Sequence, residues 1–269
     1  MDTDAFKVKA GTSVDLGKID PRSTPGWAGN KEAAANHLSE QIAKIVALQE
    51  VLYAQGTRRV LIVLQAMDGG GKDGTIRTVF DGINPQGVRV ASFKGPTDAE
   101  LAHDYLWRVH PHVPGSGEIV LFNRSHYEDV LVVAVHELVA EAHWRRRYRH
   151  IRDFEQLLTD EGTTVIKFFL HISKEEQRLR LQERLDDPRK RWKFAKADLA
   201  ERERWSDYQH AYERAISETS TDDSPWYIVP ADRNWFRNLV VAEIVSSTLE
   251  GLDLRYPPAE SGLEGLKVT

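Results

Sequence analysis

A glycine-rich segment in the first third of the chain has the residue types of a phosphate-binding loop. The stretch "VLIVLQAMDGGGKDGT", residues 60–75, is an apolar run followed by three glycines and a lysine. In the general pattern G-x-x-x-x-G-K-[ST], backbone N–H groups hold phosphates, the lysine reaches the transferred group and the hydroxyl holds magnesium. Here Ala66 replaces the first glycine and Asp73 replaces the hydroxyl residue. The loop therefore predicts phosphate binding by a modified form of the motif.

The helix expected after this loop would present its unpaired N–H groups and partial positive charge to an anion. We assign phosphate contacts to the loop and the first helical turn, namely Gly69, Gly70, Gly71, Asp73, Gly74 and Thr75. Asp68 and Asp73 could replace the missing hydroxyl at a metal ion, since magnesium prefers oxygen ligands and keeps several waters. The alternative is a tight turn with a surface lysine, which the preceding strand makes less favoured.

A second polar cluster follows the third predicted strand, in "EIVLFNRSHYEDVL", residues 118–131. Asn123 and Arg124 come directly after the apolar run, and Glu128 and Asp129 follow one helical turn later. Arginine at such a position can bind phosphate oxygens with two N–H groups at once. Taken alone, Asn123 and Arg124 are more often a turn with a surface charge. Because they follow a phosphate loop by about fifty residues, they favour a site shared with that loop.

Basic residues gather between Arg178 and Lys196, where eight positions are Lys or Arg, and again in residues 143–150. Such runs are most often solvated helix faces, and a functional role stays an open alternative for either run taken alone. Pro188 should end the helix that begins at Lys174, and Asp198 could cap the next helix. The region therefore predicts a helix, a break and a second helix over about residues 174–216, and the family resemblance described below implies that this segment is a lid.

Apolar segments alternate with helical periodicity along most of the chain, which predicts one α/β domain over residues 1–269 with a parallel sheet. The expected strands are Arg59–Gln65, Val88–Phe93, Glu118–Phe122, Thr164–Ile172 and Trp226–Val229. The expected helices are Glu32–Gln55, Ile151–Leu158, Glu175–Leu185, Leu199–Ile216 and Trp235–Leu249. Residues 1–30 contain too much Pro and Gly for regular structure and are expected to wrap the surface.

Composition limits the classes of function. Among 269 residues the net charge is −5, cysteine is absent, and no apolar run is long enough for a membrane helix. The acidic balance argues against nucleic acid as a partner, and the apolar pattern argues against a membrane. The first residues lack a secretory pattern, and the absence of cysteine suits a cytoplasmic protein.

The combination of "MDGGGKDGT", "FKGPTDAELAHDYLWRVHPHVPGSGEIVLFNRSHYEDVL" and "RLDDPRKRWKFAKADLAERERWSDYQHAYERAI" resembles class III of the second polyphosphate kinase family, over about residues 10–255. The resemblance implies a three-layer P-loop kinase fold similar to thymidylate kinase, with a five-stranded parallel sheet, flanking helices and a helical lid. It also implies magnesium-dependent phosphoryl transfer between inorganic polyphosphate and a nucleotide, and a homo-oligomer, either a dimer or a tetramer.

The same resemblance assigns roles to individual residues. It implies catalytic roles for Asp68, Lys72, Arg124 and Glu128, and metal contacts for Asp68 and Asp129. Asn123 stands where classes I and II have an aspartate, so the second metal ligand stays open. Basic positions expected along the donor or over the nucleotide are Lys94, Arg108, Arg178, Arg189, Lys190 and Lys193.

The leading prediction is an enzyme that phosphorylates AMP and ADP from polyphosphate. One alternative is an ordinary nucleoside monophosphate kinase that uses ATP, which the changes at Ala66 and Asp73 make less favoured. Another is a non-catalytic binder of nucleotides or polyanions. The sequence leaves open the polyphosphate chain length, the base selectivity, the favoured direction and the oligomer size.

Overall fold

A five-stranded parallel sheet forms the centre of the computed structural model, which describes residues 1–268. The strand order is β2-β3-β1-β4-β5, with β1 in the middle. The strands are β1 (Arg59–Ala66), β2 (Val88–Ser92), β3 (Ile119–Asn123), β4 (Thr163–His171) and β5 (Trp226–Pro230). Each begins and ends within two residues of its predicted bounds. Their continuous apolar runs are explained by helices on both faces of the sheet.

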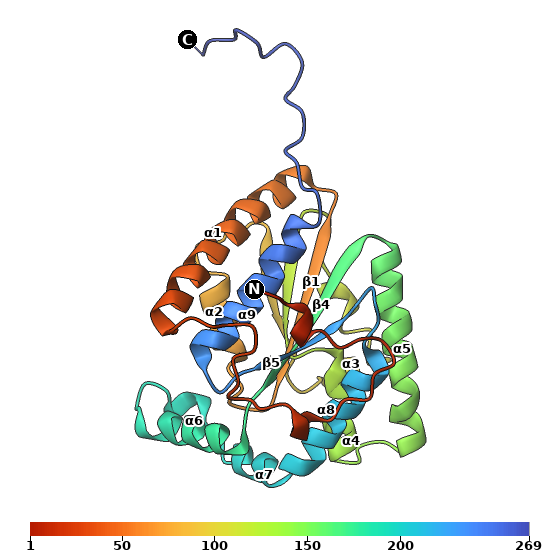
Figure 1. Ribbon diagram of the computed structural model, residues 1–269. Helices are drawn as coiled ribbons and strands as arrows, with labels where there is room; N and C mark the ends of the chain where they lie inside the picture. The colour runs from red at the N-terminus through yellow and green to blue at the C-terminus, as the bar shows by residue number, and fades with distance from the viewer. Residues whose placement is uncertain (269) are drawn as a thin grey trace.

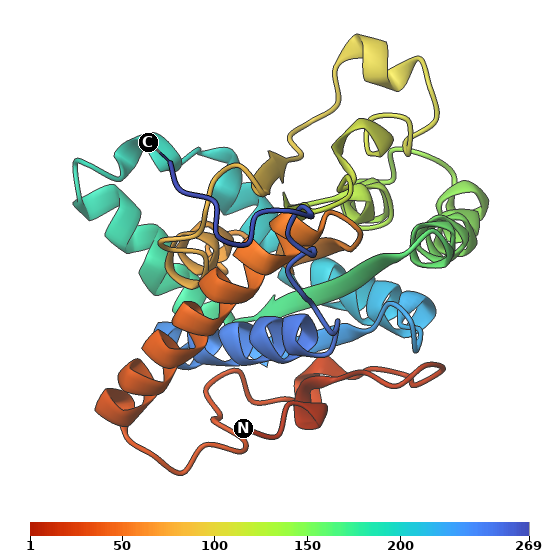
Figure 2. The ribbon, with the colours of Figure 1, turned by 90° about the horizontal axis from the view of Figure 1, so that it is seen from above.

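Helices cover the two faces in separate groups (Figures 1 and 2). One layer contains α1 (Lys31–Gln55), α2 (Lys72–Val79) and α9 (Asn234–Glu250), and α9 packs against both of the others. The opposite layer contains α4 (Val132–Val135), α5 (Glu141–Asp160) and α8 (Trp205–Thr219). Between β2 and β3 lie α3 (Asp98–Leu101) and the 3-10 turn η3 (His110–His112). The predicted three-layer α/β architecture is therefore confirmed.

The segment between β4 and β5 contains α6 (Lys174–Asp186), the turn η5 (Arg191–Lys193), α7 (Ala197–Glu203) and α8. Figure 1 shows α6 and α7 beyond the edge of the sheet at which the strands end. The break before Pro188 is confirmed. The single helix predicted over Leu199–Ile216 is wrong: it is divided at Arg204, whose guanidinium donates to the carbonyl oxygen of Val135 at 3.1 Å.

Two further predictions at helix starts need correction. Asp198 does not cap α7, because Lys196 occupies the N-cap position and the Asp198 carboxylate accepts a hydrogen bond from the N–H of Ala195. The helix predicted to begin at Ile151 begins ten residues earlier, at Glu141. Trp144 and Tyr148 are buried and continue its apolar stripe toward the N-terminus, and most of the basic side chains of the run 143–150 are exposed to solvent around them.

The N-terminal residues run along the surface, as predicted, with two 3-10 turns, η1 (Asp4–Phe6) and η2 (Leu16–Lys18). Lys7 forms an isolated antiparallel bridge with Tyr227, and the N–H of Val8 donates to the carbonyl oxygen of Trp226 at 2.8 Å. These contacts cover the outer edge of β5, which would otherwise expose unpaired backbone groups. Within residues 1–268, no helix is both long and apolar enough to cross a bilayer.

Candidate functional site

The phosphate-binding loop occupies the turn between β1 and α2, as its sequence predicts. Gly71 is the N-cap of α2 with a φ of 95°, in the left-handed region that favours glycine, and no side chain caps the helix. A β-carbon at Gly70 would lie 2.4 Å from the β-carbon of Ala66. Ala66 therefore fits here only because Gly70 has no side chain. The Lys72 ammonium donates to the carbonyl oxygen of Ala66 at 3.2 Å, which folds the lysine back over the loop.

Arg124 joins the end of β3 to this loop. Its backbone N–H donates to the carbonyl oxygen of Leu64 in β1, and its φ of 60° is unusual for a residue with a side chain. The guanidinium lies between two carboxylates: Nη2 is 2.7 Å from Oδ1 of Asp68, and Nη1 is 3.2 Å from Oε2 of Glu128. The structure thus brings together three of the predicted catalytic residues.

The two cations of the site have opposite pKa shifts. Burial lowers the pKa of Lys72, and the nearby charge of Arg124 lowers it further, against the attraction of Asp68 and Glu128. Burial also opposes the charge of Arg124, but Glu128 and Asp68 raise the pKa of that guanidinium above its ordinary value. Arg124 is therefore a fixed positive charge, and Lys72 is a cation that gains from an added anion.

Asp73, the residue in place of the usual hydroxyl, connects three elements. Its Oδ1 accepts a hydrogen bond from the Asn123 side-chain amide at 2.7 Å, and its Oδ2 lies 3.7 Å from the Lys193 ammonium. Asn123 and Asp73, both departures noted in the sequence, thus lie in direct contact. Lys193 is the predicted basic residue that reaches the loop through a side-chain contact.

Asp129 lies outside this group. Its carboxylate accepts a hydrogen bond from Arg147 at 3.0 Å, and burial raises the pKa of Asp129 to about 6 despite Arg147 and Arg108. Among residues 1–268, no three histidine or acidic side chains converge as a preformed metal site.

A cavity lies between the loop, the end of β3 and the lid segment. Asp68, Arg124 and Glu128 line it from the sheet side. The predicted lid segment, which runs from α6 to α8, contributes Gln177, Glu201, Tyr208 and Tyr212. Charged groups thus face two tyrosine side chains across this cavity.

The other predicted basic residues make local contacts. Arg178 pairs with Glu175, Arg189 with Asp187, and Lys190 with Glu183. Arg108 donates to the carbonyl oxygen of Lys94 at 2.9 Å and lies over the ring of Phe93. These positions lie at the surface of the lid segment and at the end of β2, so their predicted contacts with the donor or the nucleotide stay predictions.

Two residues at the loop were missed in the sequence. The Gln177 amide donates to the carbonyl oxygen of Asp68 at 2.8 Å, and Arg180 donates to that of Gly69 at 3.0 Å. Both lie on the first turns of α6, three residues apart and so on one helix face. They attach the lid segment to the loop backbone. The one signal in the sequence was that these two polar residues lie three positions apart on the predicted helix, close to Arg178.

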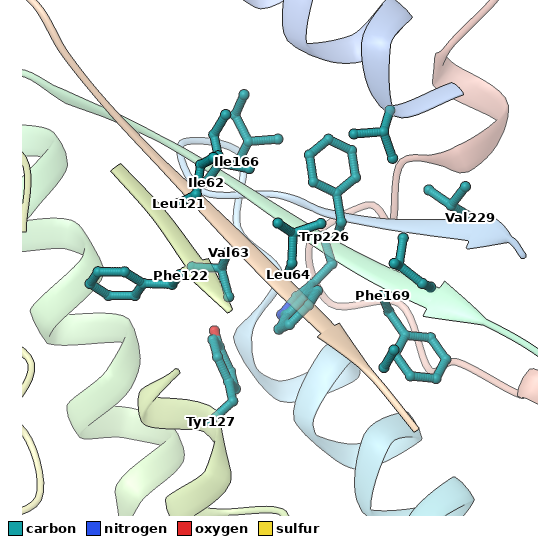
Figure 3. Packing of buried hydrophobic residues seen from close by; sticks show 14 of the residues in the cluster. Ile62, Val63, Leu64, Leu121, Phe122, Tyr127, Ile166, Phe169, Trp226 and Val229 are labelled. Atoms are coloured by element: carbon teal, nitrogen blue, oxygen red, sulfur yellow. The ribbon is translucent and has the colours of Figure 1, made fainter. Parts of the chain in front are cut away.

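A buried polar cluster contacts Tyr127, in the segment that directly follows β3. The Lys167 ammonium lies 2.5 Å from Oε2 of Glu155 and donates to the carbonyl oxygen of Thr219 at 2.7 Å. Tyr127 donates to Glu155 at 2.8 Å, and its ring packs against Trp226 (Figure 3). The Lys167 ammonium holds the pKa of Glu155 below its ordinary value although burial opposes this. The cluster fixes Tyr127, the residue next to Glu128.

Comparison with known proteins agrees with this geometry. The Polyphosphate kinase 2 family profile matches residues 28–256. A Meiothermus ruber protein named AMP/ADP-polyphosphate phosphotransferase is 58% identical over 263 residues, which is 98% of each chain. A Rhodopseudomonas palustris protein named ADP-polyphosphate phosphotransferase is 47% identical over 267 residues, covering 95% of this chain and 92% of the relative.

A solved structure extends the similarity to the whole fold. The crystal structure of Polyphosphate Kinase 2 from Arthrobacter aurescens TC1 superposes with a TM-score of 0.92 at 44% identity, and covers 96% of this chain and 92% of that one. The family match spans the loop, the β3 motif and the lid segment, which are the elements that form the cavity. The chain therefore belongs to the polyphosphate kinase 2 family.

Proposed function

We propose that this protein transfers a phosphoryl group from inorganic polyphosphate to AMP and to ADP, which gives ADP and ATP. The observation that carries the proposal is the convergence of Asp68, Arg124 and Glu128 on one cavity beside the loop of Lys72. The relatives named for polyphosphate transfer to AMP or ADP, similar over nearly their whole length, support the choice of donor and acceptor.

Phosphoryl transfer requires little covalent chemistry from the protein, so its residues act by positioning and charge neutralisation. Lys72 and the uncapped N–H groups at the start of α2 would hold the transferring phosphoryl. Arg124 would leave its two carboxylates in part to bind phosphate oxygens, and Glu128 would orient the acceptor. The lid segment would exclude water from the transfer.

Magnesium is proposed as the cofactor, because the donor set fits it. Mg²⁺ binds to one or two carboxylates, several waters and substrate phosphates, so it requires no preformed protein cage. Asp68 would hold it at the loop. Asp129, the other predicted ligand, would have to share or release its bond to Arg147. When bound, the metal neutralises charge on the phosphate oxygens.

Several broader predictions remain part of this proposal. We infer one domain over residues 1–269, with residues 174–216 as a lid that closes over the phosphates. Lys94, Arg108, Arg178, Arg189, Lys190 and Lys193 are proposed to lie along the donor or the nucleotide. The remaining predictions are a homo-oligomer and a cytoplasmic location.

A donor comparison tests the function. Purified protein is incubated with AMP or ADP, magnesium and polyphosphate, and in parallel with AMP and ATP, and with AMP or ADP and GTP. We expect product from both acceptors with polyphosphate, and rates at least about tenfold lower with either nucleotide donor. Efficient transfer from a nucleoside triphosphate alone would assign an ordinary nucleotide kinase. Binding of AMP and polyphosphate without product would assign a non-catalytic binder.

A further inference from the structure

Arg237, on the first turn of α9, is a buried guanidinium in contact with the phosphate-binding loop. It is the one basic residue of α9, and it is only 3% exposed. A β-carbon at Gly71 would lie 1.9 Å from Nη1 of Arg237, and one at Gly74 would lie 3.5 Å from Nη2. The guanidinium therefore lies directly against the backbone that is expected to hold phosphate.

The partners of this guanidinium are neutral. Nη1 donates to the side-chain oxygen of Asn234 at 2.7 Å, and Nε and Nη2 donate to that of Asn238 at 3.1 and 2.8 Å. No carboxylate in residues 1–268 pairs with it, and its charged neighbour is a second cation, Arg180. Burial, and then Arg180, lower the pKa of Arg237 to about 9, so the group is still charged at neutral pH.

A buried charge without a counter-charge costs stability, because it is removed from water and gains no compensating attraction. Such a cost is explained if a ligand supplies the missing negative charge. The adjoining loop is where the proposed function places a phosphate chain. The amide partners fix the guanidinium in place without neutralising it.

We propose that Arg237 is a positioning residue whose uncompensated positive charge, held against Gly71 and Gly74, strengthens phosphate binding at the loop. Its guanidinium contacts the loop backbone, and its charge attracts the phosphate bound there. It does not replace Lys72 or Arg124 at the transferred group. The inference rests on the proposed function only in that the loop binds a phosphate chain. If Arg237 served only to brace α9 against α2, the charge itself would not affect binding.

The test distinguishes an effect of the Arg237 charge on phosphate binding from a purely structural role in packing α9 against α2. Inorganic tripolyphosphate with magnesium is titrated into each protein by calorimetry at constant ionic strength, and the Tm of each ligand-free protein is measured. For Arg237→Met we expect the tripolyphosphate Kd to rise about tenfold or more, while the ligand-free Tm stays equal or rises. Arg77→Met, the same change at an exposed arginine of α2, is the matched control and should bind as wild type does.

Asn238→Asp is the second variant, since it keeps the guanidinium and its geometry but supplies a carboxylate. We expect a higher ligand-free Tm and a Kd raised about fivefold or more, because the charge is now paired within the protein. Arg237→Lys, which keeps a charge, should recover most of the binding lost in Arg237→Met.

Wild-type affinity in both Arg237→Met and Asn238→Asp would overturn the inference and leave the proposed function intact. A fall in the Tm of Arg237→Met together with wild-type affinity in Asn238→Asp would assign Arg237 to bracing alone. If the wild-type protein binds neither tripolyphosphate nor a long-chain polyphosphate, the proposed function fails and this inference fails with it.

Discussion

Arg124 and Asp68 form an ion pair of 2.7 Å that connects the end of β3 to the phosphate-binding loop. In this arrangement the predicted phosphate-binding cation and the predicted metal-binding carboxylate neutralise each other. A phosphate group would attract Arg124 and a metal ion would attract Asp68, so the two ligands arriving together replace one ion pair with two. This predicts that magnesium and polyphosphate each strengthen the binding of the other.

Lys72→Ala should lower kcat by about a hundredfold or more, because the ammonium compensates charge on the transferring phosphoryl. The Tm should remain close to that of wild type, since the lysine makes one hydrogen bond, to Ala66. Steady-state rates and thermal unfolding check both statements. Lys18→Ala, at an exposed lysine, is the matched control. Wild-type turnover in Lys72→Ala would remove the catalytic assignment.

The lid lysines should differ in effect. Lys193 reaches Asp73 on the loop, whereas Lys190 pairs with Glu183 on its own segment. We expect Lys193→Ala to raise the KM for polyphosphate about threefold or more and to make it less sensitive to salt, and Lys190→Ala to change it less. Initial rates over a salt series measure this. Equal KM values in wild type and Lys193→Ala would place that lysine on a solvated face only.

Glu128 should affect the choice of acceptor. Its carboxylate lines the cavity and binds Arg124, where it would orient the acceptor, and it repels a longer acceptor phosphate chain more than a short one, so AMP gains more from it than ADP does. For Glu128→Gln we expect kcat with AMP to fall about tenfold, a loss of about 1.4 kcal/mol, and kcat with ADP to fall much less. Rates with both acceptors on one preparation decide it. Equal losses would mean that Glu128 serves both reactions alike.

The buried pair of Lys167 and Glu155 should dominate a stability experiment. Lys167→Met removes the cation and leaves a fully buried carboxylate, at a cost of about 3–5 kcal/mol in the free energy of unfolding. The double change Lys167→Met/Glu155→Gln should cost less, because the remaining amide is neutral and still accepts from Tyr127. Urea unfolding of both variants tests this. A double variant less stable than the single would contradict the charge argument.

Asp129 predicts a pH dependence. Its folded-state pKa of about 6 lies above the ordinary value of 3.8, so its charged form is disfavoured in the native protein. The stability it contributes is complete below about pH 4 and is lost as the pH rises through about 6. Asp129→Asn does not titrate. Its stability relative to wild type should therefore increase by up to about 3 kcal/mol between about pH 4 and 7.

Urea unfolding at a series of pH values measures this difference, and a constant difference would contradict the assignment. Addition of magnesium separates the second role proposed for Asp129. If Asp129 holds the metal, magnesium with tripolyphosphate should stabilise the wild type more than Asp129→Asn.

The sheet was predictable because its strands are buried on both faces and so appear as continuous apolar runs. The start of α5 was not, since Trp144 and Tyr148 stand among arginines and the charge hides the apolar stripe. No Gly or Pro marks the break between α7 and α8 at Arg204. It depends on a contact with Val135, which lies far away in sequence.

The site was predictable where its residues are neighbours in the chain, as in the loop and in the β3 motif. Residues that reach the loop through tertiary packing gave no comparable signal. Gln177 and Arg180 are ordinary polar residues of a charged helix, and Arg237 is the one basic residue of α9. Burial and missing counter-charges exist only in the folded protein.

The position of β1 at the centre of the sheet also determines when the loop can form during synthesis. β1 pairs with β3 and β4, and Arg59 lies opposite Thr163, more than a hundred residues later. Contacts of such long sequence separation form slowly. A ribosome therefore releases β1 and the complete loop well before β3 and β4, the two strands that pair with β1, have been synthesised. Until β4 emerges, the apolar β1 lacks one of its two partner strands, and an unpaired apolar strand of this kind is prone to aggregation.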